Sequence, residues 1–168
     1  MANDKLGRPT DQRIAVLRNQ VSNLFKYGRI ETTVAKAKAV SSEAEKILTL
    51  AINTYEDNAK VEKTITENGT KVKKEIINDG PKKLAARRKM MAFLYDLKEE
   101  RREKEGLEAY RARTQGINHP LIEKIFNVYA PKYADRAKEL GTKGGYTRVI
   151  KTGARRGDAA ELAIVELV

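Results

Sequence analysis

The chain has 168 residues, and its 34 basic and 23 acidic side chains give a formal net charge of +11 at pH 7. It contains one His and no Cys, which excludes disulfides, thiolate metal sites and cysteine nucleophiles. No stretch approaches the roughly 18 apolar residues of a membrane span, and the first residues lack the apolar run of a signal peptide. We therefore expect one cytoplasmic domain over residues 1–168, with nucleic acid as the first candidate for a polyanionic partner.

The first third of the chain predicts a basic arm over residues 1–9, followed by two helices joined by a strand. Pro9 and then Thr10 or Asp11 signal the start of a helix over residues 11–27, and Gly28 is a suitable terminator. The apolar positions of this helix recur at helical spacing: Ile14, Leu17, Val21, Leu24 and Phe25.

A short strand is predicted next, over residues 29–34, because its residues are β-branched and alternate in polarity. Thr33 can cap a second helix, which we expect to end near Asp57. Its many alanines suit close helix packing. The predicted buried face contains Ala37, Val40, Ala44, Ile47, Leu48 and Ala51.

Residues 60–77 predict a β-hairpin, because Asn68-Gly69 lies between two alternating runs. A two-residue turn there pairs Glu67 with Thr70. The same register puts four apolar residues on one face of the hairpin and opposes Lys63 to Lys74 and Glu62 to Glu75, at a small cost. The four apolar residues form the pairs Ile65 with Val72 and Val61 with Ile76. We expect this hairpin to pack on the rest of the domain or on a neighbouring protein.

A third helix is predicted over residues 81–97, with Asp79 or Gly80 as its cap and Pro81 at its first position. Its apolar stripe contains Leu84, Met91, Leu94 and Tyr95, widened by Met90, Phe93 and Leu97. The nearly all-charged run from Lys98 to Glu105 is typical of a solvated helix, which Gly106 would break or bend.

The last third predicts one more helix and two strands. Asn118 can cap the helix, and Pro131 is expected to limit it. Strands follow over residues 146–152 and 161–167. The strands over residues 29–34, 146–152 and 161–167 can then form a small three-stranded mixed sheet with helices on one face. The predicted fold class is therefore α+β, a two-layer helix and sheet domain with a peripheral β-hairpin.

The sequence offers little for catalysis. His119 is the only imidazole, so no Ser/His/Asp set can be assembled, and its place at a helix start favours a capping or surface role. The run from Gly141 to Gly145 lacks the residue order of a phosphate-binding P-loop. We therefore expect no enzyme activity, no cofactor, no metal and no small-molecule substrate.

Positive charge is concentrated in three segments. Residues 1–29 hold six basic and two acidic side chains, residues 81–113 hold eleven and six, and residues 132–157 hold eight and two. Basic residues in the first turns of a helix oppose the helix dipole, which suggests an external anion near residues 82–89. Clusters of this kind favour phosphate binding.

Particular residues in these segments are suited to RNA. Gly144 to Arg148 combine backbone amides, one aromatic ring and a cation, although Tyr146 is equally well interpreted as a core residue on a strand. Two glycines flank Arg155 and Arg156, which suggests a tight turn. The candidate RNA-binding residues are Lys5, Arg8, Arg13, Arg18, Arg29, Lys38, Arg87, Arg88, Gly144, Gly145, Tyr146, Arg148, Arg155 and Arg156.

Taken in order, several short motifs resemble the bacterial large-subunit ribosomal protein seventeen family. They include Lys5-Leu6-Gly7-Arg8, Asp11-Gln12-Arg13, Arg29-Ile30-Glu31-Thr32-Thr33, Gly144-Gly145-Tyr146-Thr147-Arg148 and Gly157-Asp158-Ala159-Ala160. The match covers most of the chain. Residues 54–80, which contain the hairpin, and residues 98–118, a charged and helical stretch, stand out as insertions relative to short members.

The resemblance implies a structural constituent of the bacterial 50S subunit, in the cytoplasm, near the polypeptide exit side. Its partners would be the large-subunit (23S) ribosomal RNA and neighbouring ribosomal proteins. The motif residues that would face RNA are Arg8, Arg13, Arg18, Arg29, Lys38, Arg148 and Arg156.

Two alternatives belong to other classes. A DNA-binding architectural protein would suit the charge, but no basic recognition helix of a helix-turn-helix pair stands out. An enzyme acting on an acidic substrate lacks catalytic side chains. Cations dispersed over three regions suit a folded RNA, which brings several strands together, better than a single groove.

Overall fold

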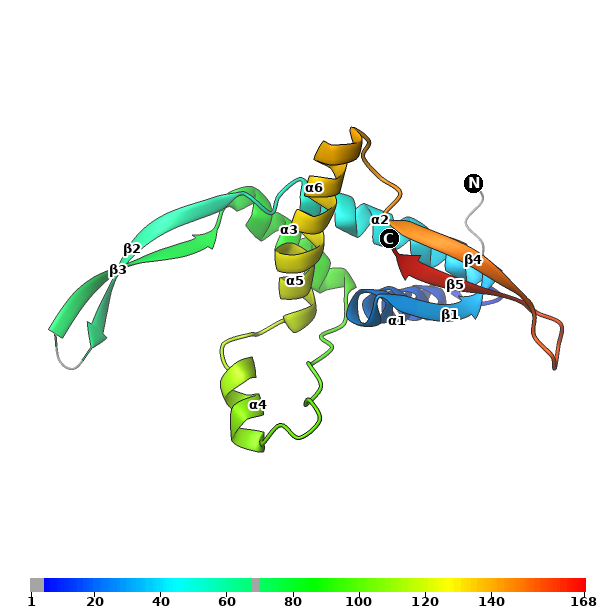
Figure 1. The fold of residues 1–168 in the computed structure, drawn as a ribbon, viewed down its shortest axis with the longest axis horizontal. Coiled ribbons are helices and arrows are strands. Elements are labelled where there is room, and N and C mark those ends of the chain that lie inside the picture. Colours follow the sequence, from blue (N-terminus) through cyan, green and yellow to red (C-terminus); the bar gives the residue numbers. More distant parts are fainter. Residues whose placement is uncertain (1–4, 68–69) are drawn as a thin grey trace.

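The computed structural model describes residues 5–67 and 70–168, which form helices and two small antiparallel sheets. Helices cover one face of the larger sheet (Figure 1), and this is the α+β class expected from the sequence. The elements are α1 (Thr10–Tyr27), β1 (Arg29–Thr33), α2 (Val34–Ile52), β2 (Asn58–Glu67), β3 (Thr70–Asp79), α3 (Pro81–Phe93), α4 (Leu107–Thr114), α5 (Pro120–Lys124), a π-helical turn (Ile125–Tyr129), α6 (Ala130–Leu140), β4 (Thr147–Ala154) and β5 (Glu161–Leu167).

The larger sheet has the strand order β1-β5-β4, and β5 pairs antiparallel with both neighbours. The expectation of a mixed sheet is therefore wrong. The short connection between β4 and β5 makes those two strands antiparallel. The other edge of β5 receives β1 in the opposite direction, with Arg29 opposite Glu166 and Thr33 opposite Leu162.

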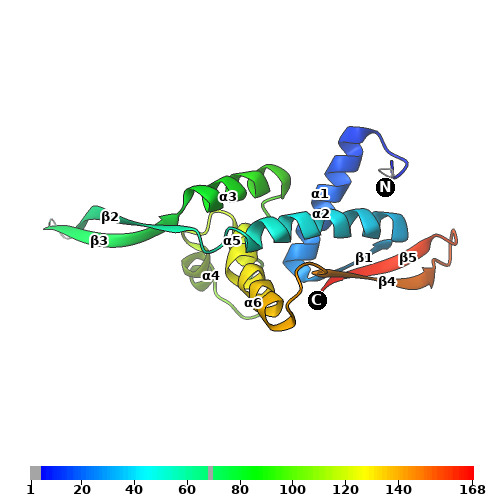
Figure 2. The same cartoon turned by 90° about the horizontal axis from the view of Figure 1, so that it is seen from above.

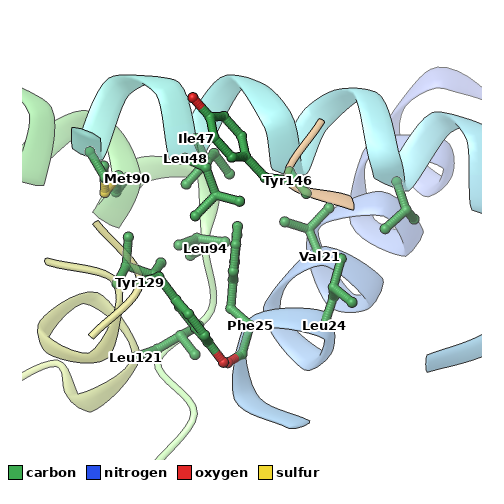
Figure 3. Packing of buried hydrophobic residues seen from close by; sticks show 14 of the residues in the cluster. Val21, Leu24, Phe25, Ile47, Leu48, Met90, Leu94, Leu121, Tyr129 and Tyr146 are labelled. Carbon is green, nitrogen blue, oxygen red and sulfur yellow. The ribbon is translucent and has the colours of Figure 1, made fainter. Parts of the chain in front are cut away.

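The core lies between this sheet and the helices, and its largest contribution comes from α1 and α2. Val21, Leu24 and Phe25 of α1 are fully buried, and the predicted apolar face of α2 is buried along its whole length. Figure 3 shows Leu48 of α2 close to Phe25. Ile14 is 45% exposed, because the first turns of α1 project beyond α2 and the sheet (Figure 2).

The ends of the first two helices differ in part from the prediction. Pro9 occupies the N-cap position of α1 and its carbonyl accepts the Arg13 N–H at 2.9 Å, so neither Thr10 nor Asp11 is the cap. Thr33 precedes α2 without a side-chain capping bond, and α2 ends at Ile52. Gly28 is confirmed as the terminator of α1: its φ is +79°, and its N–H donates to Leu24.

The predicted hairpin is confirmed as β2 and β3. Its register is the expected one, with Glu67 opposite Thr70, while the turn residues Asn68 and Gly69 lie outside the described residues. Figures 1 and 2 show the strands projecting away from the rest of the molecule, with only their base near α3. The described part of the hairpin therefore does not pack on the domain, and a neighbouring protein stays a prediction.

Helix α3 ends four residues earlier than predicted, and the charged run after it is not helical. The Tyr95 N–H donates to Ser22 Oγ at 3.0 Å, which turns the chain away from the helix axis. Ala86 and Met90 face the core together with Leu94, whereas Leu84, Met91 and Tyr95 are exposed, so the predicted stripe was partly wrong.

Cross-element ion pairs explain the extended course of residues 95–106. Lys26 Nζ lies 2.8 Å from Glu100 Oε1, and Arg113 of α4 pairs with both Glu99 and Glu105. These acids therefore bind partners on other elements instead of neighbours one helical turn away. The helical part of residues 98–118 is confined to α4.

Pro131 does not end the last helix, as the sequence had suggested. The Ala130 N–H donates to the Ile125 carbonyl, five residues back, in the π-helical turn. Proline lacks an N–H and needs space at the preceding turn of a helix, and this wide turn accommodates it. The helix therefore continues to Leu140. At the start of this helix, His119 rather than Asn118 takes the N-cap position.

None of the helices in the described ranges is both long and apolar enough to cross a membrane.

Candidate nucleic-acid interface

Exposed cations gather at the end of the molecule that carries the sheet. Lys5 and Arg8 lie before α1, Lys38 lies in the first turns of α2, and Arg156 lies in the β4–β5 connection; all four are exposed. Figures 1 and 2 show these segments at the same end, opposite the hairpin. We name these four residues the basic end.

The β4–β5 connection is shaped by an ion pair within it. Arg155 donates to Asp158 through Nε at 2.9 Å and Nη2 at 2.6 Å, and Asp158 Oδ1 also accepts the Ala160 N–H. The hydrogen bond with Arg155 lowers the pKa of Asp158 and raises that of Arg155. Arg155 therefore holds the turn closed, and the neighbouring Arg156 stays exposed.

The start of α2 lies beside this connection. Lys36 and Arg155 line one hollow together with Thr33, and Lys38 lines an adjacent hollow with Ala160. Segments more than 100 residues apart in sequence thus place cations around one edge of the sheet. Lys36 was absent from the sequence-based list, because a single lysine in a helix gives no signal by itself.

Arg29 and Arg148 flank Glu166 on the uncovered face of the sheet. Both are the Cα partners of Glu166 in the register, one on each side, and both are exposed. Arg148 Nη1 lies 3.5 Å from Glu166 Oε1. Because one carboxylate lies between two guanidinium groups, these three side chains carry a net positive charge and are able to bind an anion.

The glycine-rich loop before β4 is held by Arg136, a residue that the sequence did not indicate as part of the site. Arg136 of α6 donates through Nη2 to the carbonyls of Gly144 and Gly145, at 2.7 and 3.0 Å. Both glycines have positive φ, at +95° and +62°, a backbone conformation that other residues rarely adopt. The loop is therefore built around Arg136, with its carbonyls already bound.

Tyr146 is a core residue. Its side chain is 3% exposed, and its ring centroid lies 5.0 Å from that of Tyr133. Burial raises the pKa of the Tyr133 phenol to about 12. Of the two interpretations of Tyr146, the structure supports packing, and its ring is not accessible for stacking on a base.

Arg18 is directed inward rather than toward solvent. Its Nε donates to the Phe93 carbonyl at 2.6 Å and its Nη2 to the Ala92 carbonyl at 3.0 Å, so it caps the C-terminus of α3. Its guanidinium carbon lies 4.9 Å from the centre of the Tyr95 ring. Arg13, one turn earlier in α1, is half-buried.

The start of α3 is capped from inside the protein, whereas Lys82 and Lys89 are exposed, so an external anion near residues 82–89 stays a prediction. Asp57 Oδ2 accepts the backbone N–H groups of Lys82 and Lys83 at 2.8 and 3.2 Å and thereby caps the helix. A Cβ at Gly80 would lie 2.5 Å from the Asp57 carboxylate, so this close approach requires glycine.

Arg87 is likewise paired internally. Its guanidinium donates to Asp79 and to Glu123, while its neighbour Arg88 is exposed. Burial lowers the pKa of Arg87, but the hydrogen bonds with the two carboxylates outweigh that effect and raise it. The bond with Arg87 lowers the pKa of Asp79. Only Arg88 of these two candidate residues is accessible to an external ligand.

Comparison with known proteins identifies related sequences. Residues 16–168 match the model of a family described as ribosomal protein L17. The chain is 36% identical over 192 residues to the large ribosomal subunit protein bL17 of Acetivibrio thermocellus, with 99% of each chain covered. It is 40% identical over 184 residues to the protein of that name from Lachnospira eligens, with 98% of this chain and 97% of the relative covered. The corresponding protein of Clostridium tetani is 38% identical over 164 residues, covering 98% and 96%.

Proposed function

The chain belongs to the ribosomal protein L17 family, and from this membership we propose that it is a structural constituent of the bacterial large ribosomal subunit. It binds 23S rRNA and adjoins other proteins of that subunit, without enzyme activity. Its location is near the polypeptide exit side, a point that rests on the family resemblance alone.

The observation that carries the RNA-binding part of the proposal is the basic end. Lys5 and Arg8, Lys38, and Arg156 come from three separate segments and remain exposed at one end of the molecule. Cations on separate segments can neutralise phosphates of several RNA strands that lie close together. The protein would thereby bridge strands that otherwise repel one another.

The test is co-sedimentation of the tagged full chain with ribosomal particles from a cell lysate, at low and high salt. We expect stoichiometric migration with the large subunit that resists moderate salt. Migration with free protein would contradict the proposal, and migration with DNA would support an architectural protein instead.

A charge-reversal triple variant, Arg8→Glu, Lys38→Glu and Arg156→Glu, tests the basic end. It should reduce incorporation into the large subunit. The matched control is Lys46→Glu, Lys82→Glu and Lys138→Glu, three exposed lysines on α2, α3 and α6 that change the net charge equally. Equal loss in both variants would mean that net charge alone matters and that the basic end is not the interface.

A further inference from the structure

Tyr27, the last residue of α1, exposes an aromatic ring that the basic end does not include. Its side chain is 60% exposed, the largest exposed fraction of any aromatic residue in the described ranges. The Tyr27 Oη donates to Glu100 Oε1 at 3.0 Å, and Lys26 Nζ lies over the ring at 5.2 Å from its centre, so two contacts hold the ring in place. A fixed and exposed ring can receive a base by stacking.

A cation-rich hollow of about 300 Å³ lies on one side of Tyr27. It is formed by the end of α1, residues 97–102, α4 and the start of α5, and its lining includes Lys98, Arg102 and Lys124. Lys98 and Arg102 are exposed, whereas Lys124 donates to the Lys26 carbonyl at 2.7 Å. These side chains can neutralise a phosphate group.

The acidic residues in this hollow are already compensated. Glu100 accepts hydrogen bonds from Lys26 and Tyr27, which lower the pKa of its carboxyl group, and Glu99 pairs with Arg113. The hollow therefore retains a net positive charge in spite of its two carboxylates.

A second hollow of about 350 Å³, lined by amide side chains and by Glu31, also borders Tyr27. Asn19 and Asn23 of α1 line it, and Asn23 Nδ2 donates to Asn19 Oδ1 at 2.7 Å. Within the described residues, that bond leaves one acceptor on Asn23 and one donor pair on Asn19 available. An amide surface with both donors and an acceptor can pair with a base edge that carries both, such as the N6 and N7 edge of adenine.

We propose that Tyr27 and the two hollows on either side of it form a binding site for one unpaired nucleotide, with adenine as the best-matched base. The base stacks on the Tyr27 ring, its edge meets Asn19 and Asn23, and its phosphate lies toward Lys98 and Arg102. The inference rests on the proposed function, because the nucleotide belongs to the ribosomal RNA. It specifies a contact with a base, whereas the basic end supplies contacts with phosphates.

Site-specific crosslinking tests the location. The full tagged chain carries a photoreactive benzoylphenylalanine in place of Tyr27, and assembled large subunits are irradiated and mapped by primer extension. We expect one dominant stop at an unpaired nucleotide. The same replacement at Tyr95, which lines neither hollow, serves as the matched control and should give no such stop. A chain that enters the subunit but crosslinks only to protein, or to no RNA, would overturn the proposal.

Binding of the purified full chain to protein-free large-subunit rRNA separates stacking from the hydroxyl contact. Base stacking on an aromatic residue is worth about 5- to 150-fold in affinity, so Tyr27→Ala should weaken binding by a factor in that range. Tyr27→Phe, which loses only the bond to Glu100, should bind within about 3-fold of the unchanged protein. Equal losses in the two variants would overturn the stacking role. Failure of the unchanged chain to bind rRNA would instead contradict the proposed function itself.

Discussion

At the scale of single residues, several cations that resemble ligand-binding residues in the sequence serve the fold. Arg18 is the clearest case, because its guanidinium donates to two carbonyls at the end of α3, 74 and 75 positions away in the chain. Ser22 accepts the Tyr95 N–H beside it. Together these side chains of α1 determine where α3 ends.

Replacing Arg18 by Ala should lower the free energy of unfolding by about 1–3 kcal/mol, because hydrogen bonds with a charged donor have about that value. Urea denaturation followed by circular dichroism measures the change. Arg88→Ala on the exposed face of α3 removes the same charge and should change stability by less than about 0.5 kcal/mol. If the two variants were equally stable, the capping role of Arg18 would be wrong.

The residue scale is also where prediction from the sequence is most limited. The sequence shows that Arg18 and Arg87 are cationic, but the residues they contact are distant in the chain. No local pattern therefore distinguishes an internal hydrogen bond from a contact with RNA. The sequence also left undecided whether Tyr146 packs in the core or stacks on a base, since a residue on a strand can face either side of the sheet. Exposed residues such as Arg156 were easier to place, because flanking glycines indicate a turn.

At the scale of elements, the sequence predicts best where the period of apolar residues is regular. The buried face of α2 and the register of the hairpin were both confirmed, because each depends on local spacing. The non-helical run from Lys98 to Glu105 and the continuation of the helix past Pro131 were not predicted. The first depends on ion pairs with distant elements, and the second on a π-helical turn that leaves no mark in the sequence.

The projecting hairpin leads to a prediction about stability. Replacing residues 60–77 by Asn-Gly should preserve the base of the hairpin, where Lys83 Nζ donates to Asn58 Oδ1 at 2.7 Å. Because the described part of the hairpin contacts the rest of the protein only at this base, the loss should stay below about 1 kcal/mol, which corresponds to about 2–4 °C in Tm for a protein of this size.

Thermal unfolding followed by circular dichroism provides this measurement. Asp57→Ala, which removes the cap of α3 next to the hairpin base, should by contrast cost about 0.5–2 kcal/mol. A much larger loss on removal of the hairpin would show that it packs on the domain, whereas reduced incorporation with unchanged Tm would favour a neighbouring protein as its partner.

At the scale of the whole molecule, the elongated shape separates two kinds of surface (Figure 1). The sheet end carries exposed cations on separate segments, whereas residues 60–80, at the other end, hold five basic and four acidic side chains. Between them, Arg87 and Arg113 contribute formal positive charge that is paired with carboxylates. The net charge of +11 therefore overstates the positive charge that is accessible to an RNA.

This distinction predicts the salt dependence of binding to protein-free large-subunit rRNA. Each neutralised phosphate contributes about 0.7–0.9 to the slope of log affinity against log salt, so Lys38→Gln with Arg156→Gln should reduce the slope by about 1.5. The matched double variant, Lys83→Gln with Arg87→Gln, removes the same formal charge but only from ion pairs with Asp79 and Glu123, and should leave the slope unchanged if circular dichroism shows that it is folded. Equal reductions in the two variants would mean that RNA responds to the total charge of the chain, and that the exposed cations of the sheet end do not form a defined interface.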